Sequence, residues 1–205
     1  MLQIYLARHG QDEDNAQDIL NGHRDTPLTQ RGIDQAKEIA QKIKAAGIKF
    51  DKVYSSPLQR AFQTAMIITN TIGIDKPIKL EEIIEREFGI MTGRFKSEIE
   101  PMCAPDIIKT DTIIYFLNPE GAETFPQLIE RGKKIITKIT NDCQDGKILL
   151  VTHGDIGKMI YAAYYNLDWQ KVLTLFHFGN SDFLLLSPDS PATESHVFKI
   201  KQHNT

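Results

Sequence analysis

Two apolar runs near opposite ends of the chain, in the stretches YLARHGQ (residues 5–11) and LLVTHGD (residues 149–155), end in the same pair, His-Gly. A short apolar run bounded by glycine is typical of a buried β-strand. If these two strands lie parallel and adjacent, their carboxyl ends share one edge of a sheet, where open α/β proteins bind ligands. The repeated pattern therefore predicts that His9 and His153 converge on one site.

Strands and helices alternate along most of the chain. The predicted strands occupy residues 3–7, 51–56, 76–80 and 147–152, and the predicted helices occupy residues 30–47, 57–73, 125–139 and about 156–165. Three further apolar runs, at 171–178, 181–187 and 195–200, follow one another too closely for crossover helices, so we expect antiparallel strands there. The alternation predicts a three-layer α/β/α sandwich around a mixed, mostly parallel central sheet.

The length and the charge of the chain limit its organisation and its partners. A chain of 205 residues suits a single domain, and the irregular stretch at about 90–123 is expected to form a small lid insertion. The net charge is −3 and the lysines are scattered along helical faces, so we expect no nucleic-acid partner.

Cysteine usage and hydropathy bear on the compartment. Cys103 and Cys143 have no CxxC spacing and are too few for a disulfide framework, which favours reduced thiols. No basic segment or cleavage site is apparent at the N-terminus, and no apolar run approaches the ~18 residues of a membrane span. We therefore predict a cytoplasmic protein without a membrane partner, and a homodimer is left open.

Two arginines are expected beside the two histidines. Arg8 precedes His9, and Arg60 lies in the first turn of the helix that follows the strand in VYSSPLQRA. Guanidinium groups bind phosphate oxygens bidentately and stay charged at neutral pH. Gly154, directly after His153, lets the backbone approach a ligand. The cluster therefore predicts phosphate binding, and a histidine in it can serve as a nucleophile.

Five stretches that follow one another over most of the chain, LARHGQ, GHRDTPLTQRG, SSPLQRAFQTA, EREFG and VTHGD, resemble signatures of the histidine phosphatase superfamily, the phosphoglycerate mutase-like enzymes with an RHG motif. The resemblance implies that His9 becomes phosphorylated and that Arg8, Arg60 and His153 form the phosphate pocket. The substrate-side positions that it implies are Asn15, beside the phosphate, and the turn of Asn21 and Gly22.

The resemblance also implies a general acid, because an alkoxide is a poor leaving group at neutral pH. Glu85 stands four residues before Gly89, in the family's Glu-x-x-x-Gly pattern, and is the expected proton donor, with Glu87 as the alternative. The pKa of Glu85 would have to rise for it to hold a proton near pH 7, and burial beside Phe88 would favour such a shift.

The sequence favours a phosphatase over a mutase. The lid segment lacks the pair of arginines that grips the substrate carboxylate in mutases, and Phe88 replaces the tyrosine three residues after their acid. The expected enzyme is a phosphoric monoester hydrolase of the histidine acid phosphatase type, acting on a small phosphorylated metabolite. A phosphoglycerate mutase-type phosphotransferase and a non-catalytic phosphate-binding protein stay open as alternatives.

The remaining polar residues give weaker indications. The six histidines show no HExxH motif or closely spaced pair, so we predict neither a metal site nor a cofactor. The lid cations Arg94, Lys96 and Lys109 either meet a second anionic group of the substrate or are ordinary solvated side chains. The histidines expected to be structural or on the surface are His23, His177, His196 and His203.

Overall fold

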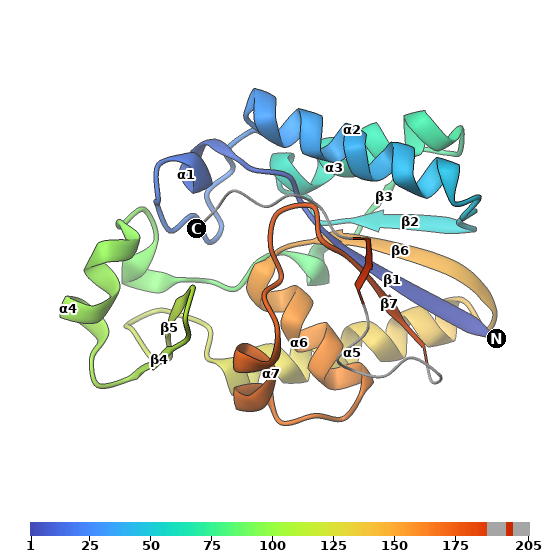
Figure 1. Cartoon of the computed structure of the whole chain (residues 1–205). Coiled ribbons are helices and arrows are strands. Elements are labelled where there is room, and N and C mark those ends of the chain that lie inside the picture. The colour runs from blue at the N-terminus through green and yellow to red at the C-terminus, as the bar shows by residue number, and fades with distance from the viewer. Residues whose placement is uncertain (188–195, 199–205) are drawn as a thin grey trace.

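The computed structural model describes residues 1–187 and 196–198, and a mixed sheet of six strands runs through its centre (Figure 1). The strands of this sheet, in spatial order, are β3 (Ile78–Lys79), β2 (Lys52–Ser55), β6 (Gly146–Thr152), β1 (Leu2–Arg8), β7 (Phe183–Leu186) and β8 (His196–Phe198). The first four of these run parallel, whereas β7 is antiparallel to β1 and β8 is antiparallel to β7. The predicted mixed, mostly parallel sheet is confirmed.

Helices cover both faces of this sheet (Figure 1). One face carries α2 (Gln30–Ala45) and α3 (Gln59–Ile72), and the other carries α5 (Phe125–Asp142), α6 (Gly154–Tyr164) and α7 (Trp169–Leu175). Side chains of β1 alternate between the two layers, because successive residues of a strand point to opposite faces. Ile4 and Leu6 pack with α5 and α6, while Tyr5 and Ala7 pack with α2 and α3. The three-layer α/β/α sandwich is thus observed.

The register of the central strands brings the two His-Gly pairs together. β1 and β6 pair in parallel from Leu2 with Gly146 to Arg8 with Thr152. The backbone N–H of His9 then donates to the carbonyl of Thr152 at 3.0 Å. His9 and His153 consequently leave the same edge of the sheet from neighbouring strands, as the sequence predicts.

The apolar run at 171–178 differs from its prediction as a strand. It belongs largely to α7, which Asp168 caps by accepting a hydrogen bond from the Lys171 N–H at 3.1 Å. The other end of α7 is held by the buried Lys158, whose ammonium donates to carbonyls of Leu173 and Phe176. Periodicity alone does not separate a short apolar helix from a strand, and these polar contacts favour the helix.

Residues 90–123, the predicted lid segment, project beyond the carboxyl end of β1 (Figure 1). The elements in this region are α4 (Ile99–Cys103), β4 (Ile107–Lys109), β5 (Ile114–Phe116) and two single-turn 3-10 helices, η2 (Gly89–Met91) and η3 (Lys96–Glu98). A third 3-10 helix, η1 (Glu81–Ile83), precedes the segment. A small hydrophobic cluster of Met91, Ile99 and Phe116 joins the segment to Leu20 and Phe88. The loop that contains Leu20 and the lid segment therefore pack against each other in one hydrophobic cluster.

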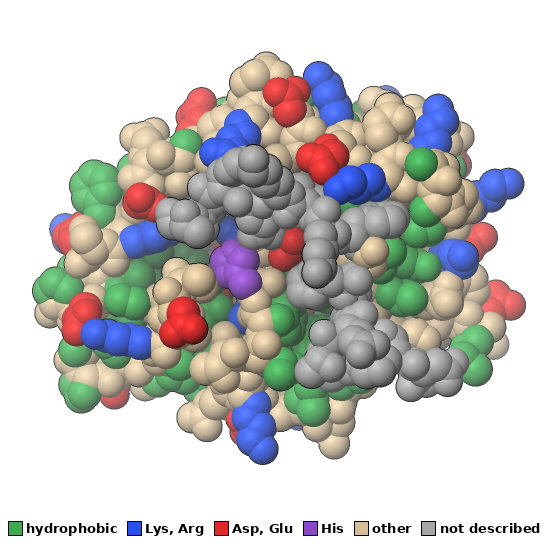
Figure 2. All heavy atoms as spheres, viewed as in Figure 1, with side chains coloured by type: hydrophobic (Ala, Val, Ile, Leu, Met, Phe, Trp, Pro, Cys, Tyr) green, Lys and Arg blue, Asp and Glu red, His purple; other side chains and the backbone are tan. Residues whose placement is uncertain are grey.

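Three further properties concern membrane-spanning helices, the cysteines and the distribution of surface charge. Within residues 1–187 and 196–198, no helix combines the length and the apolar character required to cross a bilayer. Cys103 and Cys143 are both free thiols. On the face shown in Figure 2, acidic and basic side chains of the described residues are interspersed. His203 lies outside the described residues.

Candidate active site

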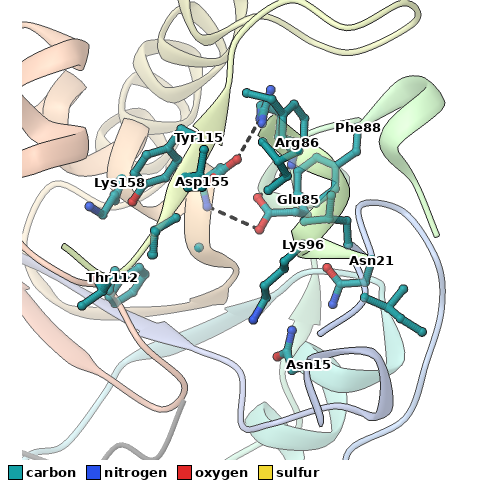
Figure 3. A pocket seen from close by; sticks show the side chains of 18 of the residues that line it. Asn15, Asn21, Glu85, Arg86, Phe88, Lys96, Thr112, Tyr115, Asp155 and Lys158 are labelled. Atoms are coloured by element: carbon teal, nitrogen blue, oxygen red, sulfur yellow. Dashed lines mark hydrogen bonds and ion pairs between the residues drawn. The ribbon is translucent and has the colours of Figure 1, made fainter. Parts of the chain in front are cut away.

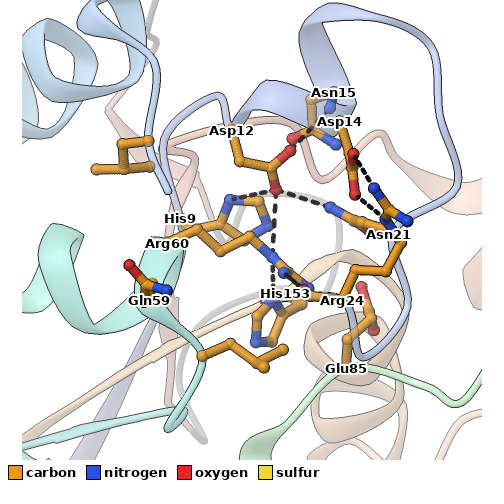
Figure 4. A network of polar contacts seen from close by, with 12 residues as sticks. His9, Asp12, Asp14, Asn15, Asn21, Arg24, Gln59, Arg60, Glu85 and His153 are labelled. Atoms are coloured by element: carbon orange, nitrogen blue, oxygen red, sulfur yellow. Dashed lines mark hydrogen bonds and ion pairs between the residues drawn. The ribbon is translucent and has the colours of Figure 1, made fainter. Parts of the chain in front are cut away.

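His9 and His153 form the centre of a buried polar cluster (Figure 4). Their ring centroids are 5.0 Å apart, and His9 keeps only 1% of its surface exposed. Nδ1 of His9 lies 2.6 Å from the carbonyl oxygen of Gly10. A carbonyl can only accept a hydrogen bond, so Nδ1 carries the proton and Nε2 keeps its lone pair when the ring is neutral. This tautomer is the one required for nucleophilic attack through Nε2.

His153 is the N-cap residue of α6, and its protonation state follows from its neighbours. Nε of Arg60 donates to Nδ1 of His153 at 3.2 Å, and Nε2 of His153 lies 2.7 Å from Oγ of Ser56. An imidazole nitrogen that accepts from a guanidinium carries no proton, so His153 is neutral and is protonated on Nε2. Two helix starts and one strand end therefore converge on this imidazole.

Arg60 lies in the first turn of α3, as the sequence predicts, but its guanidinium bonds to the protein itself. It is fully buried and donates to the carbonyl oxygens of Arg24 at 2.6 Å and Gly22 at 2.8 Å. Its Nε also lies 3.2 Å from a carboxylate oxygen of Asp12. Arg60 thus holds the 22–24 turn in place, and a phosphate would have to replace one of these partners to bind it directly.

Asp12 is a buried carboxylate that the sequence does not single out. Its two oxygens accept from the Asn15 N–H and from Nδ2 of Asn21, each at 2.7 Å. One oxygen also lies 3.9 Å from Nδ1 of His9. Asp12 therefore links Asn15, Asn21 and Arg60 to the nucleophile candidate (Figure 4). The N-cap pattern at the start of α1 (Glu13–Ala16) is the only sequence signal that marks it.

Arg8 faces the cavity next to this cluster and has unused donors. One of its terminal nitrogens donates to the carbonyl of Phe178 at 2.7 Å, whereas its buried Nε has no protein partner. A Cβ placed on Gly154 would lie 3.5 Å from the Arg8 guanidinium carbon and 3.7 Å from a carboxylate oxygen of Glu85. A Cβ at this position would therefore make ordinary van der Waals contact with both side chains, which lie close to Gly154.

The three substrate-side positions lie on the same side of His9. Asn15 and Asn21 line the cavity, and Gly22 adopts a positive φ of 48° beside the ring of Phe88. Asn180, which the sequence analysis did not identify, donates to the carbonyl of His9 and to Oδ1 of Asn15, both at 3.1 Å. The asparagine amide at 180 thus orients Asn15 towards the cluster.

Glu85 and Glu87, the two candidates for the proton donor, differ sharply in their surroundings. Glu85 is buried at the N-terminus of α6, where its carboxylate accepts from the backbone N–H groups of Asp155 and Ile156 at 3.3 and 3.2 Å. The side chain of Glu87 is 40% exposed and pairs with His23 at 2.9 Å. Only Glu85 lines the cavity beside Arg8, so the geometry favours it over Glu87.

Electrostatics in the cluster set the protonation states. Burial, reinforced by the charges of Arg60 and Arg8, holds the pKa of His9 well below its ordinary value. Burial and Arg60 lower the pKa of His153 in the same way. Burial and the neighbouring Asp155 carboxylate raise the pKa of Glu85, although the backbone amides of Arg86 and Ile156 oppose this shift. These shifts favour the neutral imidazole of His9 and oppose ionisation of the Glu85 carboxyl.

A cavity of about 400 Å³ opens between this cluster and the lid segment (Figure 3). Arg8, Asn15 and Glu85 line it, as do Tyr115 and Phe116 of β5. His177, expected to be structural or on the surface, also lines it. The volume is typical of a site for a small organic molecule. Within the part of the chain that the structure describes, no group of three or more His, Cys, Asp or Glu side chains is placed to hold a metal ion.

A family model for the histidine phosphatase superfamily, branch 1, matches residues 4–199. The chain belongs to this superfamily. It is 29% identical over 179 residues to a 2,3-bisphosphoglycerate-dependent phosphoglycerate mutase of Parvibaculum lavamentivorans, with 84% of each chain covered. A mutase of the same description from a Methylobacterium species is 30% identical over 159 residues, with 74% and 75% covered. The chain is thus a histidine phosphatase superfamily member with relatives among phosphoryl-transfer enzymes.

Solved structures of the superfamily share the fold. Phosphoserine phosphatase of Entamoeba histolytica in complex with 3-phosphoglyceric acid matches with a TM-score of 0.74 at 26% identity, covering 90% of both chains. A mycobacterial glucosyl-3-phosphoglycerate phosphatase in complex with VO3 matches with a TM-score of 0.77 at 23% identity, covering 90% and 92%. The superfamily therefore includes phosphatases and mutases on the scaffold that this chain adopts.

Proposed function

We propose that the protein is a phosphomonoesterase that hydrolyses its substrate through a phosphohistidine at His9. The observation that carries the proposal is the tautomer of His9, because the bond from Nδ1 to the Gly10 carbonyl leaves Nε2 able to attack phosphorus. Arg8, which lines the cavity, would bind the phosphate oxygens with its free donors.

Glu85 supports both halves of the reaction. In the first half, its protonated carboxyl would donate to the leaving alkoxide when His9 takes the phosphoryl group. In the second half, the resulting carboxylate would accept a proton from the water that attacks phosphohistidine. Its raised pKa and its place on the cavity wall suit this double role. Charge stabilisation would come from Arg8, Arg60 and the neutral His153, and no step needs a metal.

A mutase is the second candidate, because the curated relatives named above are phosphoglycerate mutases. Two features favour hydrolysis instead. Phe88 contributes a ring without a hydroxyl at the position after the acid where mutases carry tyrosine, and that ring packs against Phe116 with centroids 5.1 Å apart. The lid segment between 90 and 123 also contains a single arginine, Arg94, which pairs with Glu98 on the surface.

The experiment is phosphate release from a panel of phosphomonoesters in EDTA, by the wild type and by His9→Ala, with acid-labile phosphoenzyme trapped in parallel. We expect turnover that EDTA does not change, a trapped phosphohistidine in the wild type, and a loss of at least about a thousandfold in His9→Ala. Circular dichroism of the variant checks that it is folded.

Two results would contradict the proposal. Loss of activity in EDTA would indicate a metal-dependent reaction. Label that stays on His9 without net release would favour a mutase or a phosphate-binding protein, and a phosphorylated acceptor would separate these, since only a mutase would return the label to it.

A further inference from the structure

The cavity beside Glu85 has walls that the proposed reaction does not use. Apolar side chains on these walls include Ile19 and Leu20 from the loop after α1, Phe88 just before the lid, and Ile113, Tyr115 and Phe116 of the lid. Ile19 is half-buried and belongs to none of the hydrophobic clusters of the core. Its side chain therefore contributes apolar surface to the cavity and not to the interior.

Lys158, a cation of the cavity wall, has its donors engaged. The residue is 2% exposed, and its ammonium group donates to the backbone carbonyls of Val172, Leu173 and Phe176. An ammonium group has three hydrogens, so three carbonyls satisfy it completely. Burial also lowers the pKa of Lys158 to about 8. Lys158 thus holds the end of α7 and has no donor left for a substrate anion.

Arg86 is the second cation, and its charge is balanced within the wall. Its Nε donates to Asp155 at 2.8 Å, and a terminal nitrogen donates to the Glu123 carbonyl at 3.3 Å. The guanidinium carbon lies 4.3 Å and 4.4 Å from the ring centroids of Phe116 and Phe125. An anion that approached the buried Arg86 would have to compete with the Asp155 carboxylate, its partner in an ion pair, which is costly.

The third cation, Lys96, lies at the mouth of the cavity. Its Nζ is 2.7 Å from a carboxylate oxygen of Asp18, and both side chains are largely exposed to solvent. His177 also lines this wall and is an imidazole without an obligatory charge. Away from the Arg8 and Glu85 side, the cavity therefore presents apolar surface, the hydroxyl groups of Ser97, Thr112 and Tyr115, and cations that already have partners.

We infer that the leaving group of the substrate is an uncharged alcohol with an apolar body, either alkyl or aryl. This inference rests on the proposed function, since it concerns the alcohol that the phosphatase releases. The phosphate would bind at Arg8, and the alcohol would extend along Ile19, Tyr115 and Phe116 towards the lid. A second anionic group, as in 3-phosphoglycerate or phosphoserine, would meet apolar walls or displace an existing ion pair.

The test compares two esters of equal length whose alcohols have similar pKa values: hexyl phosphate and the phosphate ester of 6-hydroxyhexanoate. The two leaving groups are chemically alike at the oxygen that departs. The difference in kcat/KM therefore measures how the enzyme discriminates between a methyl group and a carboxylate at the far end of the alkyl chain. We expect hexyl phosphate to be preferred at least about tenfold. Within the series from ethyl to hexyl phosphate, kcat/KM should rise, by up to about fourfold for each methylene that becomes buried.

A matched pair of variants tests whether the preference for hexyl phosphate depends on the wall of the cavity. Ile19→Lys adds a cation to the apolar surface and should narrow or reverse the preference for hexyl phosphate over the carboxylated ester. Ile90→Lys makes the same change at an exposed isoleucine that does not line the cavity, and it should leave the preference unchanged. Lys96→Met should also leave it unchanged, because Lys96 is paired with Asp18 at the surface.

Three outcomes would overturn the inference: equal or better turnover of the carboxylated ester by the wild type, a flat alkyl series, or loss of carboxylate turnover in Lys96→Met. Failure of the proposed function is recognised separately, since neither ester would then release phosphate. In that case, calorimetric binding of both esters to His9→Ala still tests the chemistry of the wall, and tighter binding of the carboxylated ester would refute it.

Discussion

A negative charge next to the nucleophile candidate is the most consequential single-residue feature. Asp12 lies 3.9 Å from Nδ1 of His9 and 3.2 Å from Nε of Arg60, although a carboxylate repels an incoming phosphate. When Nε2 of His9 takes a phosphoryl group, the ring carries its proton on Nδ1 and becomes more positive. A carboxylate on the Nδ1 side offsets this charge, and its bonds to Asn15 and Asn21 also fix the loop.

Asp12→Asn keeps the size of the side chain and removes its charge. We expect kcat to fall by up to about a hundredfold, because Arg60 and the Asn21 loop lose their anchor and the His9 ring loses its counter-charge. The control is Glu13→Gln, which removes an exposed carboxylate one residue away. Steady-state turnover and the rate of phosphoenzyme decay measure the effect. Equal kinetics for Asp12→Asn and the wild type would exclude this role.

Glu85 and His9 together set the expected pH dependence. Glu85 must be protonated to act as the acid, and its raised pKa means that this form is lost only as pH rises above the ordinary glutamate range. His9 must be neutral, and its lowered pKa keeps it neutral as pH falls below the ordinary histidine value. The kcat/KM for alkyl phosphates should therefore peak on the acidic side and fall as pH rises.

Glu85→Gln tests this assignment through the leaving group. Turnover of an alkyl phosphate should fall by about 10²- to 10⁴-fold, and the fall towards alkaline pH due to this acid should disappear. Turnover of nitrophenyl phosphate, which releases a stabilised anion, should fall much less. Glu87→Gln is the control, because Glu87 is partly exposed and pairs with His23. Equal losses of the two substrates in Glu85→Gln would assign the proton donor to another group.

At the scale of elements, the site depends on how closely α6 approaches α5. Gly132 of α5 faces Met159 of α6, and a Cβ at Gly132 would lie 2.8 Å from the Met159 carbonyl oxygen. This close contact places the N-terminus of α6, which binds the Glu85 carboxylate, against the sheet edge. The packing of two helices thus affects the position of Glu85, the proposed proton donor, through the N-terminus of α6.

Gly132→Ala separates packing from helix propensity. Alanine favours an isolated helix by about 1 kcal/mol over glycine, yet we expect net destabilisation of roughly 1–3 kcal/mol because the backbone of α6 would have to move. Thr137→Ala, on the exposed side of α5, gains propensity without a clash and should be neutral or slightly stabilising. Urea unfolding monitored by circular dichroism measures both, and a stabilised Gly132→Ala would contradict the close approach.

The helices and strands differ in how well the local sequence predicts them. The strands that carry the two His-Gly pairs were predictable, because their apolar runs end in glycine and their pairing follows from the α/β pattern. α7 was not predictable as a helix. The Asp168 cap is a weak signal, and Lys158, which binds the carbonyls at the end of α7, comes from another part of the chain. Asp12 and Asn180 were missed for a similar reason: their importance lies in contacts that exist only after folding.

At the scale of the whole molecule, the site is assembled from distant parts of the chain. His9, Arg60, Glu85 and His153 each follow or begin a different element, and the sheet order brings their ends to one edge. Sequence reasoning predicted this convergence, because parallel strands in such sheets end on the same side. The composition of the cavity walls was not predictable, since it depends on how the lid segment packs over Leu20 and Phe88.

The position of β1 between β6 and β7 has a consequence for synthesis. β1 is flanked on both edges by strands that lie far downstream of it in the sequence, β6 and β7. At about 5–20 residues per second, β1 waits roughly ten to thirty seconds before both neighbours exist. Its unpaired edges are a template for unwanted pairing during that time. The nascent chain therefore contains His9 long before it contains β6 and the N-terminus of α6, on which the proposed site also depends.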